Sequence, residues 1–198
     1  MQEKSYHWYD IHSQEWIEFA SKQDMSWPYS DFLPHLSPKA NILDLGCGCG
    51  RDLIHFQKRG FLVAGLEGSP KLCEIARRQT QTNILHQDFD ELSLPPKHYD
   101  GIFANAVLMH VSPDKRLNFL STIYSSLKDG GIFYAHYPKG DKTETYADGR
   151  TLHLTNSWPD LAENFLWVTE LNEGRPAFVS PEEQNWQVIR YRKTVIND

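Results

Sequence analysis

The sequence has few cysteines, no long apolar run and no excess of basic residues, and each absence excludes a class of protein. Its 198 residues include 20 Lys and Arg against 26 Asp and Glu, for a formal net charge of -6. A negative charge repels phosphate backbones, so no nucleic-acid partner is expected. No apolar run approaches the roughly 20 residues that cross a bilayer, and the first ten residues lack the apolar stretch of a secretory signal. We therefore expect a cytoplasmic protein without membrane contact.

The cysteines themselves predict thiols that pack in the fold. There are three, an odd number, and Cys47 and Cys49 lie only two positions apart inside a glycine-rich turn. A zinc site would need further ligands at matching spacing, and no second cysteine pair or His-x-x-x-His segment follows. No metal is expected.

The residues that are present predict a folded α/β domain. Hydrophobic residues make up 40% and charged residues 23% of the chain, which is typical of globular proteins, and the length suits a single domain over residues 1–198. From residue 41 onward, short apolar runs alternate with helix signals, which is the pattern of parallel strands joined by crossover helices. The expected parallel strands are residues 41–45, 62–67, 83–88, 99–106 and 131–138. We predict a doubly wound, mostly parallel, Rossmann-like sheet of seven strands with an antiparallel edge strand.

Two helices have distinct start signals. Ser69 and Pro70 form an N-cap followed by proline at the first helical position, and Ser112 and Pro113 repeat this device. Apolar residues recur at three- and four-residue steps along the second helix, at Leu117, Leu120, Tyr124 and Leu127. The glycine pair at 130–131 is expected to end it.

The flanking segments are expected to complete the domain around a core at residues 40–138. Residues 1–39 contain helical patterns and several prolines, and we predict that they form a helical cap over the sheet. The polar segment 139–155 predicts an exposed loop, whose part 139–153 could act as a lid. Residues 185–195 alternate like an antiparallel edge strand paired with residues 165–171, so 139–198 would supply the lid loop and the carboxyl-terminal strands.

The segment "DLGCGCG" predicts a nucleotide-sized pocket at the end of the first strand. Gly46, Gly48 and Gly50 allow a sharp bend and leave room for a ligand on the backbone. The next position of a dinucleotide motif would need a glycine three residues after Gly48, where this chain has Arg51, so an NAD-dependent oxidoreductase is disfavoured. Glu67 ends the second strand, where a carboxylate accepts hydrogen bonds from ribose hydroxyls.

These residues resemble the class I S-adenosylmethionine-dependent methyltransferases. In that family the first strand ends Asp/Glu-x-Gly-x-Gly-x-Gly, and the second and third strands end in acidic residues. Here the matching positions are Asp44 through Gly50, Glu67, and Asp88 followed by Phe89. The resemblance covers residues 40–138. It implies S-adenosyl-L-methionine as cofactor and S-adenosyl-L-homocysteine as product, and a pocket edged by carboxylates suits a cofactor that carries a sulfonium cation and no phosphate.

The resemblance also implies a role for each matching residue. Asp44 would reach the methionine amino group, and the backbone of the turn at Gly46, Cys47 and Gly48 would line the methionine and ribose. Arg51 is a candidate partner for the cofactor carboxylate.

At the other end of the cofactor, Glu67 would hold the ribose and Asp88 would accept from the adenine amino group. Gly68, Ser69 and Phe89 would flank the ring. Asp88 could instead cap the turn that follows it. At the end of the fourth strand, Asn105 would lie near the reacting sulfur, or it could only satisfy backbone groups.

A general base is needed only for an acceptor that arrives protonated. His110, after the fourth strand, and His136, in the fifth, are the candidate catalytic residues, with Tyr137 and Tyr146 nearby. Both histidines could equally be structural.

The acceptor is expected to be a small molecule. Family members that methylate amino nitrogens of nucleobases or glutamine usually end the fourth strand with Asn/Asp-Pro-Pro-Tyr/Phe, whereas this chain has "NAVL" at 105–108. Aromatic residues of the cap could hold an amine by cation-π contact, or could simply dock the cap onto the core; they are Trp8, Tyr9, Trp16, Trp27 and Tyr29. The alternative to an enzyme is a cofactor-binding sensor or partner subunit without turnover.

Overall fold

The computed structural model describes residues 6–158, 165, 167–173 and 186–194. Its strands are β1 Asn41–Leu45, β2 Leu62–Glu67, β3 Ile84–His86, β4 Tyr99–Asn105, β5 Leu127–Pro138, β6 Thr143–Thr145, β7 Thr151–His153, β8 Trp167–Glu173 and β9 Trp186–Lys193. Its α-helices are α1 Tyr6–Ile11, α2 Ser13–Ser21, α3 Ser26–Phe32, α4 Arg51–Lys58, α5 Pro70–Thr80 and α6 Arg116–Ser126. Short 3-10 helices lie at η1 Leu33–His35, η2 Phe89–Glu91, η3 Leu108–His110 and η4 Pro113–Lys115.

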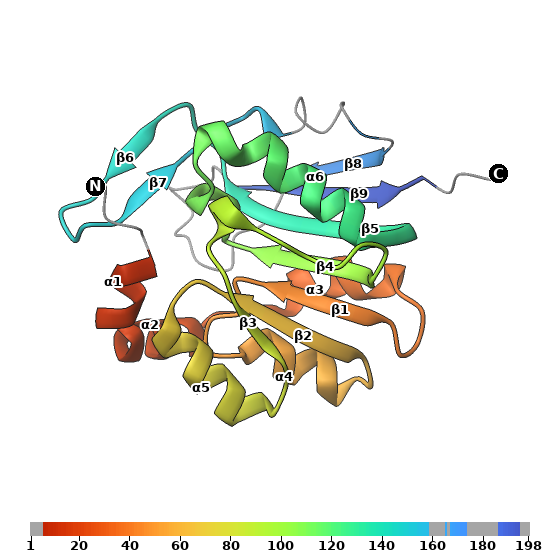
Figure 1. The fold of residues 1–198 in the computed structure, drawn as a ribbon, viewed down its shortest axis with the longest axis horizontal. Coiled ribbons are helices and arrows are strands. Elements are labelled where there is room, and N and C mark those ends of the chain that lie inside the picture. Colours follow the sequence, from red (N-terminus) through yellow and green to blue (C-terminus); the bar gives the residue numbers. More distant parts are fainter. Residues whose placement is uncertain (1–5, 159–164, 166, 174–185, 195–198) are drawn as a thin grey trace.

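The main sheet has seven strands in the order β3-β2-β1-β4-β5-β9-β8 (Figure 1). The first five run parallel, and β9 pairs antiparallel with β5 on one side and with β8 on the other. The predicted fold class is therefore confirmed. The antiparallel strand lies one position inside the edge, because β8 occupies the edge itself.

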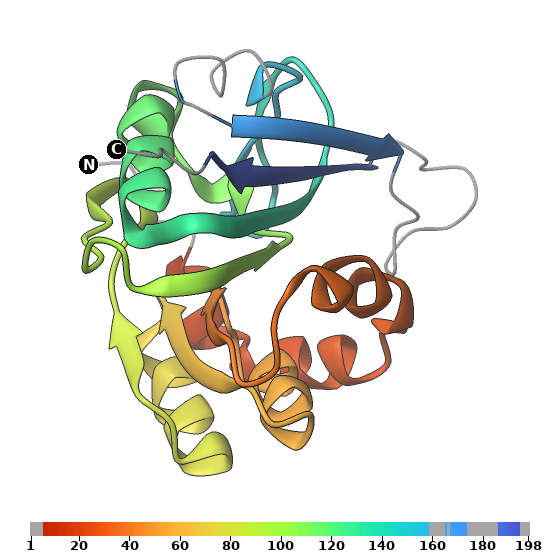
Figure 2. The same cartoon turned by 90° about the vertical axis from the view of Figure 1, so that its right-hand side faces the viewer.

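Helices cover both faces of this sheet, because side chains alternate along each buried strand. On one face Ile42, Phe103 and Tyr134 pack with Phe32 of α3 and Phe56 of α4. On the other face the cluster joins strand residues to the buried side of α6, and it includes Leu43, Leu45, Ile102, Phe133, Phe119, Leu120 and Ile123. Figure 2 shows the sheet with α6 on one side and α3 on the other. Because β1 to β4 run parallel and are joined by crossover helices, their carboxyl ends all lie at the same end of the sheet.

The two Ser-Pro segments behave differently. Ser69 caps α5 as predicted, since its side chain accepts a hydrogen bond from the Leu72 N–H. Ser112 makes no such cap; its hydroxyl instead donates to Asp90 Oδ2 at 2.6 Å. The second predicted cap is wrong because the turn after Ser112 is the 3-10 helix η4, in which the Lys115 N–H donates to the Ser112 carbonyl oxygen at 2.9 Å, and the hydroxyl is oriented toward Asp90.

The helix after Ser112 is also shorter than predicted. Helix α6 ends at Ser126, and Leu127 already belongs to β5. Leu117 is 49% exposed, while Phe119 and Ile123 are buried, so the buried stripe is shifted from the predicted one. The helix ends before the glycine pair because Tyr99 and Leu127 pair across β4 and β5.

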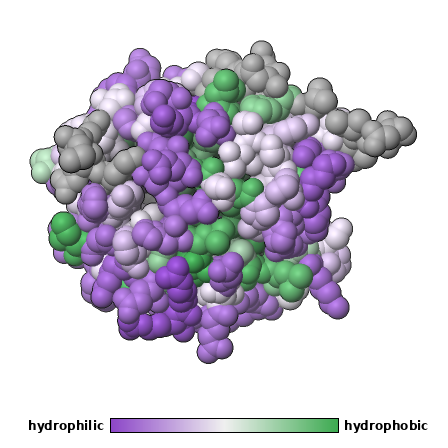
Figure 3. All heavy atoms as spheres, in the orientation of Figure 1, coloured by the Kyte–Doolittle hydropathy of each residue, from purple (hydrophilic) through white to green (hydrophobic). Residues whose placement is uncertain are grey.

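The segments outside the core have regular structure of their own. The described part of the amino-terminal region is helical, as predicted for the cap. The segment predicted as a loop contains a hairpin of β6 and β7, which pair from Thr143 with His153 to Thr145 with Thr151. None of the described helices is both long and apolar enough to cross a membrane. Figure 3 shows hydrophilic residues over most of one face, α5 included.

Candidate functional site

The turn after β1 is held by backbone hydrogen bonds that bring it against the end of β2. The N–H groups of Gly46 and Cys47 both donate to the carbonyl oxygen of Leu66, at 2.7 and 3.0 Å. Gly48 has φ +55°, and a Cβ built on it would meet only the Trp16 indole nitrogen, at 3.6 Å. The bend therefore requires a left-handed residue and leaves free space above it.

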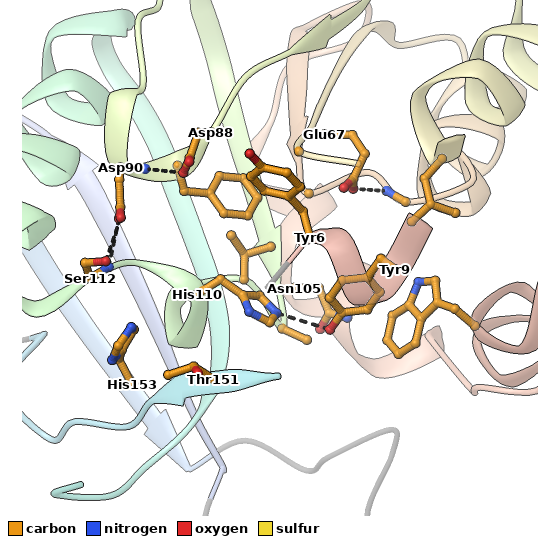
Figure 4. Close-up of a pocket in the computed structure, with 18 residues that line it drawn as sticks. Tyr6, Tyr9, Glu67, Asp88, Asp90, Asn105, His110, Ser112, Thr151 and His153 are labelled. Carbon is orange, nitrogen blue, oxygen red and sulfur yellow. Dashed lines mark hydrogen bonds between the residues drawn. The ribbon is translucent and has the colours of Figure 1, made fainter. Parts of the chain in front are cut away.

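That space is a cavity of about 260 Å³ at the carboxyl ends of β1, β2, β3 and β4 (Figure 4). Residues predicted to bind a cofactor that line it are Gly46, Gly48, Glu67, Gly68, Asp88, Phe89 and Asn105, and the candidate catalytic residue His110 lines it as well. Two of the cap aromatics suggested as an amine site, Tyr9 and Trp16, also line it. Lining residues without a predicted role at this site are Tyr6, Leu72, Asp90, Ala106, Val107, Ser112, Thr151 and His153. The topology thus brings together most of the predicted site.

Five predicted binding residues do not line the cavity: Asp44, Cys47, Gly50, Arg51 and Ser69. Arg51 donates from Nε and Nη2 to the Asp52 carboxylate and from Nη1 to the carbonyl oxygen of Ala20. Its guanidinium therefore links α2 to the start of α4. In this structure the group is bonded to Asp52 and Ala20 and does not face the cavity in which a cofactor carboxylate would lie.

The Glu67 carboxylate is fixed by the backbone around it. Its Oε2 accepts from the Gly48 N–H and its Oε1 from the Ser69 N–H, both at 2.9 Å. Burial raises the pKa of Glu67, and these backbone hydrogen bonds oppose the rise. The Gly68 N–H also bonds this carboxylate; since its two oxygens together offer about four acceptor positions, one remains for a donor in the cavity that Glu67 lines.

Asp44 lies beneath the glycine turn and is 1% exposed. Its Oδ2 has no hydrogen-bond partner among the described residues. Burial raises the pKa of Asp44 well above its usual range; Asp52 and Glu67 add to this rise and Arg51 opposes it. A cation bound above the turn would stabilise this carboxylate, which fits an ammonium group as ligand.

Asp88 caps the 3-10 helix η2 and also lines the cavity. Its Oδ1 accepts from the Asp90 N–H at 3.0 Å, which starts η2, and the residue also borders the cavity beside Phe89. The two alternatives raised by the sequence, capping and ligand contact, are therefore compatible.

The two candidate catalytic histidines occupy different positions. His110 lies in the cavity, where its Nε2 is 3.2 Å from the hydroxyl of Tyr9. His136 is fully buried outside the lining, its Nδ1 3.0 Å from Asn105 Oδ1 and its ring 4.7 Å from that of Trp186. The structure brings His110 to the cavity, whereas His136 lies behind two lining residues, Asn105 and Ala106, whose N–H donates to the His136 carbonyl oxygen at 2.8 Å.

Both histidines are expected to remain neutral well below pH 7. Burial is the largest cause that lowers the pKa of His110 and of His136 from 6.5 to about 4. Because the unfolded chain binds these protons more readily, the two residues contribute stability that is full above pH 6.5 and lost as the pH falls through 4. Imidazole NMR signals of both should stay constant from about pH 8 to pH 5.5, while the denatured chain titrates near 6.5. A midpoint near 6.5 in the folded protein for either residue would contradict this.

Comparison with known proteins agrees with the site. Residues 42–131 match the family model described as a methyltransferase domain. The fold, the glycine turn and this match support the resemblance to the class I S-adenosylmethionine-dependent methyltransferases that the motifs predicted.

The individual curated relatives are similar to this chain over only part of their length. A carboxy-S-adenosyl-L-methionine synthase of Campylobacter hominis is 34% identical over 102 residues, which cover 49% of this chain and 44% of that protein. A tRNA U34 carboxymethyltransferase of Shewanella piezotolerans is 28% identical over 176 residues, or 81% of this chain and 51% of that protein. The chain thus spans about half the length of these curated relatives.

Among solved structures, the Burkholderia thailandensis 1,6-didemethyltoxoflavin-N1-methyltransferase, crystallised with its substrate and S-adenosylhomocysteine, superposes with a TM-score of 0.72. It is 23% identical, and the superposition covers 96% of this chain and 84% of that one. At this identity the likeness supports the fold alone.

Proposed function

We propose that the protein transfers the methyl group of S-adenosyl-L-methionine to a small-molecule acceptor. The observation that carries this proposal is the cavity above the Gly48 backbone, which has the Glu67 and Asp88 carboxylates on its wall. None of the described residues that line it is a lysine or an arginine. Such a lining suits a nucleoside bearing a cation and disfavours a ligand bearing a pyrophosphate.

The described residues fit the parts of this cofactor. Glu67 would accept from the ribose hydroxyls, Asp88 and Phe89 would bind adenine, and Asp44 would stabilise the ammonium group. When bound, the cofactor supplies an activated methyl carbon, and the acceptor's nucleophilic atom displaces the sulfur in line. The protein has to align the two molecules and exclude water.

Residues of the amino-terminal helices are placed to exclude water from the cavity. Tyr6 and Tyr9 of α1 and Trp16 of α2 form the part of the lining that these helices supply, with Tyr6 beside Gly68 and Trp16 beside Gly48. Helix α1 is held there by Asp10, whose Oδ1 accepts from the Ser69 hydroxyl at 2.5 Å and from the Lys71 N–H at 3.0 Å. These contacts favour a closed site around the reacting groups.

The size of the cavity limits the space beside the cofactor. Pockets for one drug-sized ligand measure roughly 300–1,000 Å³, and this cavity measures about 260 Å³. Once the cofactor is bound, little space remains for a second molecule unless α1 moves. A tRNA acceptor, suggested by the name of one relative, is disfavoured by the net charge of -6.

The test is calorimetry with S-adenosylhomocysteine, followed by a screen of small acceptors and a tRNA pool that reads S-adenosylhomocysteine release. Binding together with turnover of a small acceptor is the expected result. Turnover of tRNA alone would refute the acceptor class. Binding without any turnover would instead support a cofactor-binding sensor, and absence of binding would refute the whole proposal.

A further inference from the structure

The cavity has two chemically different sides. Its carboxylates belong to the ends of β2 and β3 and to η2, where the cofactor would bind. On the other side lie Tyr9, His110, Thr151 and His153, from α1, η3 and β7 (Figure 4). This second side is the part of the lining that the acceptor would contact.

The polar groups of this side are already engaged with one another. The Tyr9 hydroxyl oxygen lies 3.2 Å from His110 Nε2, and the nearby Arg150 guanidinium opposes the rise in the pKa of Tyr9 that burial causes. His110 Nδ1 is buried and has no partner among the described residues. Whichever ring nitrogen carries the proton, Nε2 is engaged with Tyr9 and Nδ1 is enclosed by protein.

This arrangement makes His110 a poor general base. Nε2 is engaged with Tyr9 and Nδ1 is buried, so neither nitrogen is open to an acceptor. Burial, with the nearby Arg150 charge adding to it, also lowers the pKa of His110 to about 4, far from the pH at which a base works best. Tyr9 offers no base either, because burial raises its pKa to about 12 and the hydroxyl keeps its proton at neutral pH.

One aromatic residue of the cap, Trp8, is not available to an amine in the way the sequence suggested. The face of Trp8 is covered by Arg150, whose Cζ lies 4.3 Å from the ring centroid. The cation in this cation-π contact is thus the protein's own. Arg150 also forms an ion pair with Asp148, with Nη2 and Oδ2 2.7 Å apart, at a site where both side chains are partly exposed. The fixed cation behind Tyr9 disfavours a second cation in front of it.

We propose that the acceptor is a small molecule that reaches the site already ionised, with an anionic oxygen or sulfur as its nucleophile. This inference rests on the proposed function and names its substrate class. A lone pair of the anion forms the new bond to the methyl carbon, the carbon-sulfur bond breaks, and its electron pair stays on sulfur. The charges of anion and sulfonium cancel, no proton is released, and no base is needed.

The first test is a matched acceptor panel with wild-type protein: thiophenol, benzoate, benzamide and benzylamine, with S-adenosylhomocysteine release as readout. We expect turnover of an ionised member with kcat/KM at least about 10-fold above that of the amide and the amine. For a series of phenols of differing acidity, the pH profile should follow the ionisation of each phenol. Preference for the amine, or a profile set by an enzyme group whichever phenol is used, would overturn the proposal.

The second test addresses Arg150 as a positioning residue. Arg150→Gln should lower kcat/KM for the anionic acceptor about 10-fold, mainly through KM, while Arg150→Lys should restore part of it. The affinity for S-adenosylhomocysteine should stay within about twofold. Arg59→Gln, at the far end of α4, is the matched control and should change neither quantity.

The outcomes separate this inference from the proposed function. Normal S-adenosylhomocysteine binding with the best turnover on benzylamine would refute only the anionic acceptor. Loss of acceptor activity that is equal for anionic and neutral acceptors in Arg150→Gln would show a general structural role and also count against it. Absence of S-adenosylhomocysteine binding in the wild type would refute the proposed function itself.

Discussion

Replacing Gly48 with valine is expected to lower the affinity for S-adenosylhomocysteine at least about 100-fold. The side chain would project into the cavity directly above the backbone on which the cofactor is proposed to lie, since a Cβ there meets only Trp16. Isothermal calorimetry on the purified variant measures the loss, and circular dichroism checks that the fold is retained.

The matched control is Gly60→Val. Gly60 also has a positive φ, +84°, and a Cβ built there meets nothing within 4 Å. Both variants pay the strain of a β-branched residue in the left-handed region, about 1–3 kcal/mol of folding free energy, but only Gly48 borders the cavity. Equal binding by the two variants would show that no ligand approaches the Gly48 backbone.

The parts of the fold that could be predicted from the sequence are those set by neighbouring residues. The first two strands have the predicted bounds, and the Ser69 cap formed because its partner, the Leu72 N–H, lies three residues away. Ser112 has the same Ser-Pro context, yet its hydroxyl bonds Asp90, 22 residues earlier in the chain. A local pattern cannot reveal such a distant partner.

The position of β9 illustrates the same limit at the level of the sheet. Alternating residues over 185–195 indicated a strand, and its pairing with β8 was anticipated. The second pairing, with β5, places β9 inside the sheet. Burial of Val188, Ile189 and Tyr191 is consistent with an interior strand, but alternation alone does not distinguish an edge from its neighbour.

At the candidate site, motif spacing found the residues that follow strands and missed those supplied by other elements. Asp90, Thr151 and His153 line the cavity without a signal of their own in the sequence. Burial lowers the pKa of His110 in η3, and Arg150, which precedes β7, lowers it further. Tyr9 of α1 contacts the same histidine. Their meeting depends on the docking of the amino-terminal helices and the β6-β7 hairpin, which no local spacing encodes.

Glu67→Ala is expected to weaken S-adenosylhomocysteine binding by about 1–3 kcal/mol, through loss of charge-assisted hydrogen bonds to the ribose hydroxyls. The change should also destabilise the fold. The Gly48 and Ser69 N–H groups lose their carboxylate acceptor, and a buried donor left unpaired costs about 1–3 kcal/mol. Calorimetry measures the first effect and urea denaturation of the free protein measures the second.

Two further variants separate the direct contact from the loss of turn geometry. Glu91→Ala removes an exposed carboxylate from η2 and should change neither measurement. Glu67→Gln keeps the shape but directs an amide N–H toward one of the two backbone donors, so it should restore neither full stability nor full affinity, because one acceptor has become a donor. Binding that is unchanged in Glu67→Ala despite the lower stability would leave the carboxylate a purely structural role in the glycine turn. Unchanged stability with weaker binding would mean that water replaces the carboxylate at both backbone N–H groups and that its main role is to bind the ribose.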